Sequence, residues 1–130
     1  MSKADHISML GDYLRGEGYV PQIDEDGDLK FKYEGRSFWI LLSEKDETFF
    51  QLVFPNFWEI ESPEERIRVE RAALLASADT KVAKVYPVKE NVWASIEMFV
   101  SPMDAVRPVF NRSLRALQAA VEAFKVEMNK

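Results

Sequence analysis

The chain has 130 residues, of which 47% are hydrophobic and 30% charged, a composition typical of one globular domain. It contains no cysteine, which excludes disulfides, thiolate metal sites and thiolate catalysis. Its 22 acidic residues outnumber the 17 basic ones and give a net charge of −5, which disfavours binding to the phosphates of nucleic acids.

The first helix is expected over residues 3–16, where apolar side chains recur three and four positions apart. Gly16 and Gly18 predict its end, because glycine readily adopts the left-handed conformation that closes a helix. The apolar stripe of this helix predicts that it packs against a sheet.

A series of strands is expected next. The first covers residues 19–24 and leads to Asp26-Gly27, a dipeptide typical of two-residue hairpin turns in which both residues have positive φ. Residues 29–33 alternate between apolar and polar side chains, which predicts a strand with one buried and one wet face. Glu34-Gly35 predicts a second tight turn, and the apolar run 38–42 predicts a strand that is covered more fully.

Another strand is expected over residues 48–54, with its end at Pro55-Asn56. A second helix follows and runs to about residue 78. Its start is marked by Ser62 as the N-cap, Pro63 at the first helical position and Glu65, which completes a capping box. The inward face of this helix is expected to carry residues at helical spacing, namely Ile67, Arg71, Leu74, Leu75 and Ala78. The alanines at 72, 73 and 76 broaden this smooth face and would let the helix lie close to a sheet or another helix.

Two strands over residues 81–88 and 92–100, joined by a polar turn, come next. The last helix is expected to begin at Arg107 or Pro108 and to end near Met128. Its apolar residues form a seam like that of a coiled coil, with steps of four and three: Phe110, Leu114, Leu117, Val121, Phe124 and Met128.

The element order is therefore helix, three or four strands, helix, two strands, helix. This order predicts an α+β fold of two layers, in which helices pack on one face of an antiparallel sheet. The chain shows no repeat, low-complexity tract or linker, so residues 1–130 are expected to form a single domain.

One acidic segment invites comparison with a calcium site. Asp24, Asp26 and Asp28 resemble the start of a calcium-binding loop. Leu29 stands where such a loop needs glycine, however, and Gly35 stands where it needs its final glutamate. A hairpin turn is the better interpretation, and no metal site is expected here.

His6 is the only histidine, so a transition-metal site would have to rely on carboxylates around it. It lies near the N-terminus, and no Ser/His/Asp arrangement is evident. Paired carboxylates occur at expected helix starts and turns, where they favour the helix dipole or stay solvated. No glycine-rich phosphate loop is present. The sequence therefore predicts no catalytic residue and no cofactor.

The aromatic residues are the most informative ones. A two-layer core cannot readily hold all of them, and a strand with two apolar faces needs a second cover or a binding partner. We therefore expect at least one protein-contact or dimer surface among the following residues: Trp39, Phe49, Phe57, Trp58, Trp93 and Phe99.

Several segments together carry a resemblance to a known family. They are the hairpin 26–31, the aromatic strand Phe38-Trp39-Ile40, the segments 49–52 and 92–97, and a closing helix opened by a proline. With the element order, they resemble the type III secretion chaperone-like fold. Within that fold the chain is similar to the YbjN family, also described as bacterial sensory-transduction regulators.

The resemblance implies a small, acidic, dimeric and cytoplasmic protein without enzymatic activity, which works by holding another polypeptide. No apolar run reaches the ~20 residues of a membrane helix and no signal peptide is recognisable, so the cytoplasm is also the location that the residues favour. The leading hypothesis is a chaperone-like or regulatory protein-binding module, without nucleic acid or membrane as partner. Its homodimer interface is expected on a sheet face or on the helix 110–128.

Two other function classes stay open. A small-ligand sensor would hold its ligand in an apolar pocket between helix and sheet, lined by Trp39 or Trp58. An enzyme using carboxylates or tyrosines would require a carboxylate with a strongly raised pKa in a cleft.

Overall fold

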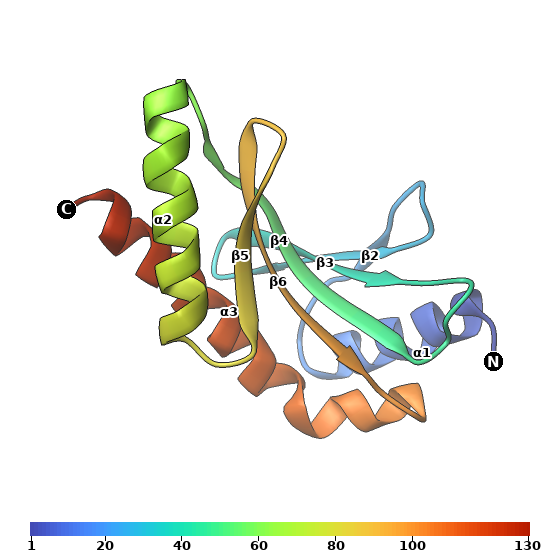
Figure 1. Ribbon diagram of the computed structural model, residues 1–130. Helices are drawn as coiled ribbons and strands as arrows, with labels where there is room; N and C mark the ends of the chain where they lie inside the picture. Colours follow the sequence, from blue (N-terminus) through green and yellow to red (C-terminus); the bar gives the residue numbers. More distant parts are fainter. The chain divides into compact units, whose positions relative to one another are not determined.

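The computed structural model describes residues 1–130 and contains three α-helices, one 3-10 helix and six strands (Figure 1). The strands form one antiparallel sheet in the order β1-β2-β3-β4-β6-β5, which confirms the predicted α+β class. In chain order the elements are α1 (Lys3–Gly16), β1 (Gln22–Ile23), β2 (Leu29–Tyr33), β3 (Arg36–Leu42), β4 (Phe49–Glu59), α2 (Pro63–Asp79), β5 (Ala83–Val88), β6 (Asn91–Phe99), the 3-10 helix η1 (Met103–Val106) and α3 (Arg107–Met128).

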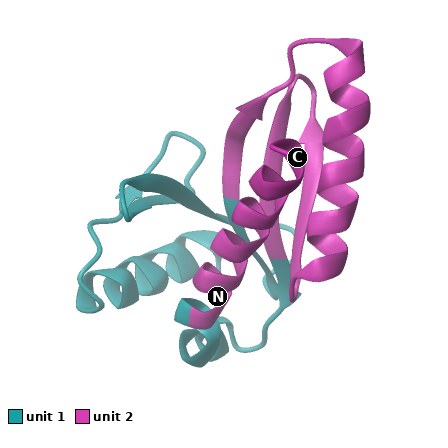
Figure 2. Cartoon of the chain, turned by 90° about the vertical axis from the view of Figure 1, so that its left-hand side faces the viewer, with its two compact units in different colours: residues 1–53, 97–111 teal, residues 54–96, 112–130 magenta.

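The chain divides into two compact units, which Figure 2 distinguishes by colour. Unit 1 comprises residues 1–53 and 97–111, and unit 2 comprises residues 54–96 and 112–130. The elements β4, β6 and α3 each contribute residues to both units. The single domain expected from the sequence stays a prediction.

In unit 1, α1 packs on the sheet as its apolar stripe predicts. Gly11 lies so close to β2 that a side-chain carbon added there would be 3.7 Å from Cδ2 of Leu29. The start of α3 joins this core through Phe110, whose ring centroid is 5.9 Å from that of Phe31. The other large buried side chains of this core come from α1 and from alternate positions of β2, β3 and β4: Ile7, Leu10, Leu14, Leu29, Phe38, Ile40, Phe50 and Leu52.

The two hairpin turns of unit 1 differ in type. Glu34 and Gly35 both have positive φ, which confirms the second turn as a two-residue one. The hairpin predicted at Asp26-Gly27 is confirmed, since β1 pairs with β2, but its expected two-residue turn is wrong, because only Gly27 has positive φ. The backbone N–H of Gly27 donates to the carbonyl of Asp24, and Asp24 pairs with Asp28, so the loop between them has three residues.

Strands β1 and β4 differ in length from the prediction. β1 has only two residues instead of the expected six, and Pro21, which has no N–H to donate, stands directly before it. β4 continues past Pro55 to Glu59. Its pairing with β3 ends at Val53, so the missing N–H of Pro55 interrupts no pairing with β3, and Asn56 takes positive φ beside it.

In unit 2, α2 turns a different face inward than the sequence predicted. Its start is confirmed, since the Ser62 hydroxyl accepts from the Glu65 N–H, although the Glu65 carboxylate caps the N–H of Glu61. The expected inward stripe is wrong, because Ile67 and Leu74 are 70% and 71% exposed. The small side chains allow a closer approach to the strand beside them, so the buried residues are instead Val69, Ala72, Ala73 and Ala76.

The α2 helix lies along β5, the last strand of the sheet (Figure 1). The Ser77 hydroxyl of α2 accepts a hydrogen bond of 2.9 Å from the backbone N–H of Val85. The neighbouring β5 residues on the side away from β6 also have no free backbone N–H. The N–H of Ala83 donates to the carbonyl of Lys81, and Pro87 has no N–H. This edge therefore offers no free donor to an added strand.

The α3 helix has the predicted bounds and the predicted seam. All six seam residues, from Phe110 to Met128, are buried within the chain, with at most 3% of their surface exposed. The seam therefore belongs to the core, and the expected homodimer interface on a sheet face or on this helix stays a prediction. No helix has the length and apolar character needed to cross a membrane.

Candidate functional site

The sheet of unit 1 has one face that α1 does not cover. Alternate residues of β3 and β4 that are not in the core point to this side, and several of them are large and apolar. We call the following residues the sheet-face patch: Trp39, Leu41, Phe49, Gln51 and Phe99.

Register and ring contacts connect the patch. Leu41 pairs with Gln51 across the β3–β4 ladder, and Trp39 pairs with Val53 one step along. The ring centroids of Phe49 and Phe99 are 5.8 Å apart. Phe99 is the least covered member, with 79% of its surface exposed, while Trp39 is half-buried. A contiguous apolar surface on a single chain is typical of a binding site.

Lysines border the patch on the β2 side. Lys30 lies opposite Trp39 in the register, and its Nζ is 5.1 Å from the centroid of the indole ring. Lys32 follows two residues later on the same face and is exposed. Two positive charges thus stand beside Trp39, whereas Glu97 of β6 lies on the same side of the sheet two residues before Phe99.

Phe57 and Trp58, two of the predicted site residues, belong to unit 2. Both rings stand edge-on to Phe124 of α3, with centroids 5.5 Å from it, and Phe57 also stacks on Phe54. Both are half-buried. Their contacts are those of packing between β4 and α3.

Trp93, the remaining predicted residue, also lies in unit 2. Its Nε1 donates a hydrogen bond of 2.9 Å to Oδ1 of Asn56. Beside it in the β5–β6 register is Tyr86, whose hydroxyl bonds to the buried Ser95. The structure thus brings together Trp39, Phe49 and Phe99 on one face of unit 1 and gives Trp93 a separate polar contact.

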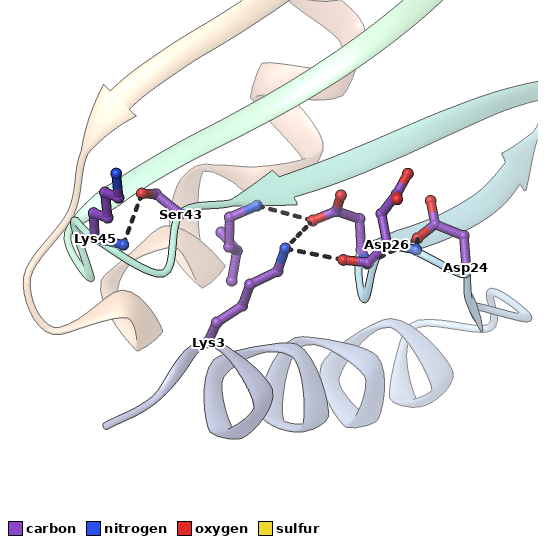
Figure 3. A network of polar contacts seen from close by, with 7 residues as sticks. Lys3, Asp24, Asp26, Ser43 and Lys45 are labelled. Atoms are coloured by element: carbon purple, nitrogen blue, oxygen red, sulfur yellow. Dashed lines mark hydrogen bonds and ion pairs between the residues drawn. The ribbon is translucent and has the colours of Figure 1, made fainter.

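The three aspartates of the first hairpin hold the loop together (Figure 3). Oδ1 of Asp24 accepts from the backbone N–H groups of Asp26 and Asp28. Lys3 of α1 reaches the same loop, with its Nζ 2.9 Å from Oδ1 of Asp28 and 3.3 Å from the carbonyl oxygen of Asp26. Oδ1 of Asp28 also accepts from the N–H of Leu42. These contacts agree with a hairpin anchored to α1.

His6 is a helical residue of α1 with only 7% of its surface exposed. It lines a cavity of about 170 Å³ together with Glu47, Thr48 and Ser101. A second cavity of unit 1, of about 530 Å³, lies between residues 18–22 and β2. Neither cavity is lined by a tryptophan, so neither matches the sensor pocket expected from the sequence.

The shifted pKa values do not mark a catalytic group. Hydrogen bonds from Ser2 lower the pKa of Asp5, whereas a general acid at neutral pH requires a raised one. Burial, with Glu17 adding to it, raises the pKa of Tyr13, and burial also raises that of Tyr19. Both phenols are therefore held in their neutral form.

Two features were missed in the sequence. Leu41 lies in the apolar run 38–42, which was predicted as a strand buried on both faces. Only the alternation of side chains along a strand places Leu41 on the same face as Trp39. The exposed Ile67 and Leu74 of α2 look like core residues by hydropathy. The alanines on the opposite face of α2 were the available signal.

Comparisons with known proteins define the fold alone. No model of a protein family matches the chain, and no curated protein sequence matches it. Among solved structures, the chain is similar to an uncharacterized protein from Methanothermobacter thermautotrophicus, with a TM-score of 0.61 and 12% identity. The match covers 95% of this chain and 99% of that one. An α+β chain of similar size thus has the same overall arrangement.

Proposed function

We propose that the protein is a non-catalytic binding module that holds another polypeptide on the sheet-face patch. The observation that carries this proposal is Phe99, which is 79% exposed and in ring contact with Phe49 on a face without a helix. Burying such a side chain against a partner removes apolar surface from water, at roughly 25 cal/mol per Å². We also propose that it acts in the cytoplasm.

The lysines that border the sheet-face patch favour a partner with acidic side chains. Lys30 and Lys32 stand beside Trp39, so acidic side chains next to apolar ones would meet both parts of the surface. We therefore infer that the partner is a segment in which apolar and acidic residues lie close together.

The β5 edge of the sheet is closed to strand addition, which favours the sheet face over this edge as the binding surface. Strand addition requires free N–H groups along an edge. Ser77, Pro87 and the bond between residues 81 and 83 leave no free donor on β5, and β1 at the other end has two residues. Strand addition at the β5 edge is therefore disfavoured, whereas residues 31–33 of β2 extend beyond β1 and pair with β3 alone.

A relation to the YbjN family stays part of this proposal. The element order supports it, with the two-residue β1 added to the three longer strands before α2. A regulatory role and a chaperone-like role both require the same capacity to hold a polypeptide, so the experiment on the patch tests what they share.

The test uses a labelled synthetic peptide of alternating apolar and glutamate residues, and fluorescence anisotropy as the measurement. We expect the protein to bind it, and a version with lysine in place of glutamate to bind more weakly. Phe99→Asp should weaken binding at least about tenfold, because it places a charge in the apolar centre. Val109→Asp is the matched control, since Val109 is also an exposed residue of unit 1 but belongs to α3.

Three results would contradict the proposal: binding of neither peptide, equal binding of both, or unchanged binding by Phe99→Asp. Circular dichroism of each variant ensures that the fold is retained. Because Phe99 is exposed, its replacement removes little packing within the chain.

A further inference from the structure

The first turn of α1 presents a buried histidine to a cavity of unit 1. His6 has only 7% of its surface exposed, yet no hydrogen bond within the chain reaches its imidazole ring. No side-chain nitrogen that is sealed from solvent lacks a hydrogen-bond partner, so the ring nitrogens of His6 reach the open space of the cavity. A polar group in such a place is satisfied by water or by a ligand. The cavity therefore offers a bound molecule a polar contact that the chain itself does not use.

Three segments of unit 1 line this cavity: the start of α1, the turn between β3 and β4, and residues 100–103 at the end of β6. Oδ1 of Asp46 accepts from both the backbone N–H and the hydroxyl of Thr48, which fixes the turn. The carbonyl of Thr48 accepts a hydrogen bond of 2.6 Å from the N–H of Val100, which joins the turn to the end of β6. Two walls of the cavity are thus held in place without a ligand, and this lowers the entropic cost of binding one.

The polar groups of the lining accept more hydrogen bonds than they donate. The carboxylate of Glu47 only accepts, and a neutral imidazole at His6 accepts at one nitrogen. The hydroxyl of Thr48 already donates to Asp46, so its oxygen is left as an acceptor, and Ser101 adds a further hydroxyl. Glu47 also gives the lining a negative charge, and no lysine or arginine lines it. These groups favour a positively charged hydrogen-bond donor.

A positive group already lies beside this carboxylate. The ammonium group of Met1 is 3.4 Å from Oε2 of Glu47, and the two side chains are 62% and 65% exposed. An ion pair this exposed contributes at most about 1 kcal/mol, so a ligand can replace it at little cost. The contact is an example, within the chain, of an ammonium group bound by Glu47.

The size and the apolar wall of the cavity define the rest of the ligand. Its volume of about 170 Å³ is the space of roughly five or six water molecules. Val100 and Met103, both buried, line it together with Pro102. A short alkyl chain against this wall is removed from water. The ligand that fits has a charged head and an apolar chain of about four carbon atoms.

We propose that this cavity binds a small primary amine, with the ammonium group between Glu47 and His6 and the alkyl chain against Val100 and Met103. A primary ammonium has three N–H donors, enough for the carboxylate, the ring nitrogen and one hydroxyl of the lining. The pocket differs in place and in lining from the tryptophan-lined one expected from the sequence. The inference does not rest on the sheet-face patch.

The same groups disfavour two other ligands. A small carboxylate would meet Glu47 with like charge. A metal ion would find one histidine and one carboxylate here, because no group of three potential metal ligands exists in the chain. Zinc sites in proteins use three or four such ligands.

Proton NMR of the full chain tests the proposal, because His6 is the only histidine and its ring protons therefore give one set of signals. The probe is n-butylammonium chloride in mildly alkaline buffer. Sodium butyrate and n-butanol are matched probes with the same number of carbon atoms and with negative or no charge. We expect butylammonium to shift the His6 signals until they saturate, and the other two probes to leave them in place.

A pair of glutamine variants separates local charge from total charge. Glu47→Gln should weaken butylammonium binding at least about tenfold, because it removes the charge that faces the ammonium group. Glu44→Gln is the matched control, since Glu44 is an exposed glutamate of the same turn that does not line the cavity. It removes the same charge from the chain and should leave binding unchanged.

His6→Phe tests the role of the ring nitrogens, because it keeps a ring at this position without a hydrogen-bond acceptor. Saturation transfer from the protein to the butyl protons replaces the histidine signal as the measurement. Binding should again weaken at least about tenfold. Circular dichroism checks that this variant, altered at a buried position, retains its fold.

The proposal is overturned if butylammonium leaves the His6 signals in place, or if butyrate shifts them as strongly. It is also overturned if Glu47→Gln and Glu44→Gln bind equally well. Phe99→Asp should still bind butylammonium, because it alters the sheet-face patch and not the cavity lining. A failure of the peptide site and a failure of the amine site can therefore be told apart.

Discussion

At the scale of single residues, a well-shielded ion pair anchors the first hairpin to α1. Lys3 and Asp28 form an ion pair of 2.9 Å with side chains only 15% and 12% exposed. Oδ1 of Asp28 also accepts from the N–H of Leu42, so one carboxylate satisfies groups on α1 and β3. Its removal leaves a shielded ammonium and a backbone donor without this partner.

Asp28→Ala should therefore lower the free energy of unfolding by about 2 kcal/mol, the range for hydrogen bonds to charged groups. Urea denaturation measures this loss. Asp26→Ala is the control, because Asp26 contributes its carbonyl rather than its carboxylate to Lys3, and it should change stability by less than about 0.5 kcal/mol. Equal losses in both variants would show that the loop, rather than the ion pair, matters.

Sequence reasoning predicted the residues of this hairpin but not their connections. The spacing of the aspartates and Leu29 was enough to favour a turn over a calcium loop. Lys3 is 25 positions from Asp28 in the chain, and no local pattern indicates that its ammonium lies there. Contacts of this kind depend on how α1 docks, which a sequence does not show.

At the scale of elements, α2 shows why hydropathy alone assigned the wrong face of a helix to the core. Hydropathy assigns Ile67 and Leu74 to the core, whereas the helix needs small side chains where it lies along β5. Ala72, Ala73 and Ala76 provide them. The bounds of α1, α2 and α3 were predictable, because caps, glycines and prolines mark them locally.

Ser77 links α2 to the edge of β5, and its loss should be measurable. Ser77→Ala removes the acceptor for the Val85 N–H and should cost about 1–2 kcal/mol of stability in urea denaturation. Ala78→Ser is the control, since it adds a hydroxyl at the neighbouring exposed position and should have little effect. An unchanged stability in Ser77→Ala would mean that water replaces the hydroxyl at that edge.

The sheet-face patch was partly predictable at this scale. Alternation along β3 and β4 places Trp39 and Phe49 on the side opposite the core, and the sequence singled out both. It also grouped Phe57 and Trp58 with them. Both contact Phe124, a partner that lies more than 60 positions along the chain.

At the scale of the whole molecule, the two units share elements rather than a linker. The elements β4, β6 and α3 each begin in one unit and end in the other. One unit can therefore unfold alone only if each of these elements breaks at the boundary between the units. The sequence offers no linker for the same reason, and the division into units could not be predicted from it.

We expect one unfolding transition for the whole chain. Variants that retain only Trp39, in unit 1, or only Trp93, in unit 2, should have the same urea midpoint relative to their own far-ultraviolet circular dichroism. Fluorescence and circular dichroism measured on the same samples provide the comparison. Separate midpoints for the two tryptophans would show that the units unfold independently.

The closed edge of β5 also limits how large any assembly of this protein can become. Growth by strand addition has no natural end, because each added strand presents a new edge, and this is how fibres form. Ser77, Pro87 and the bond between residues 81 and 83 prevent this growth at the β5 end of the sheet. When a sheet face or a helix binds a partner, by contrast, that surface becomes buried and is no longer available to a further copy. The chain can therefore expose aromatic side chains for binding without offering the β5 edge to the growth of a fibre.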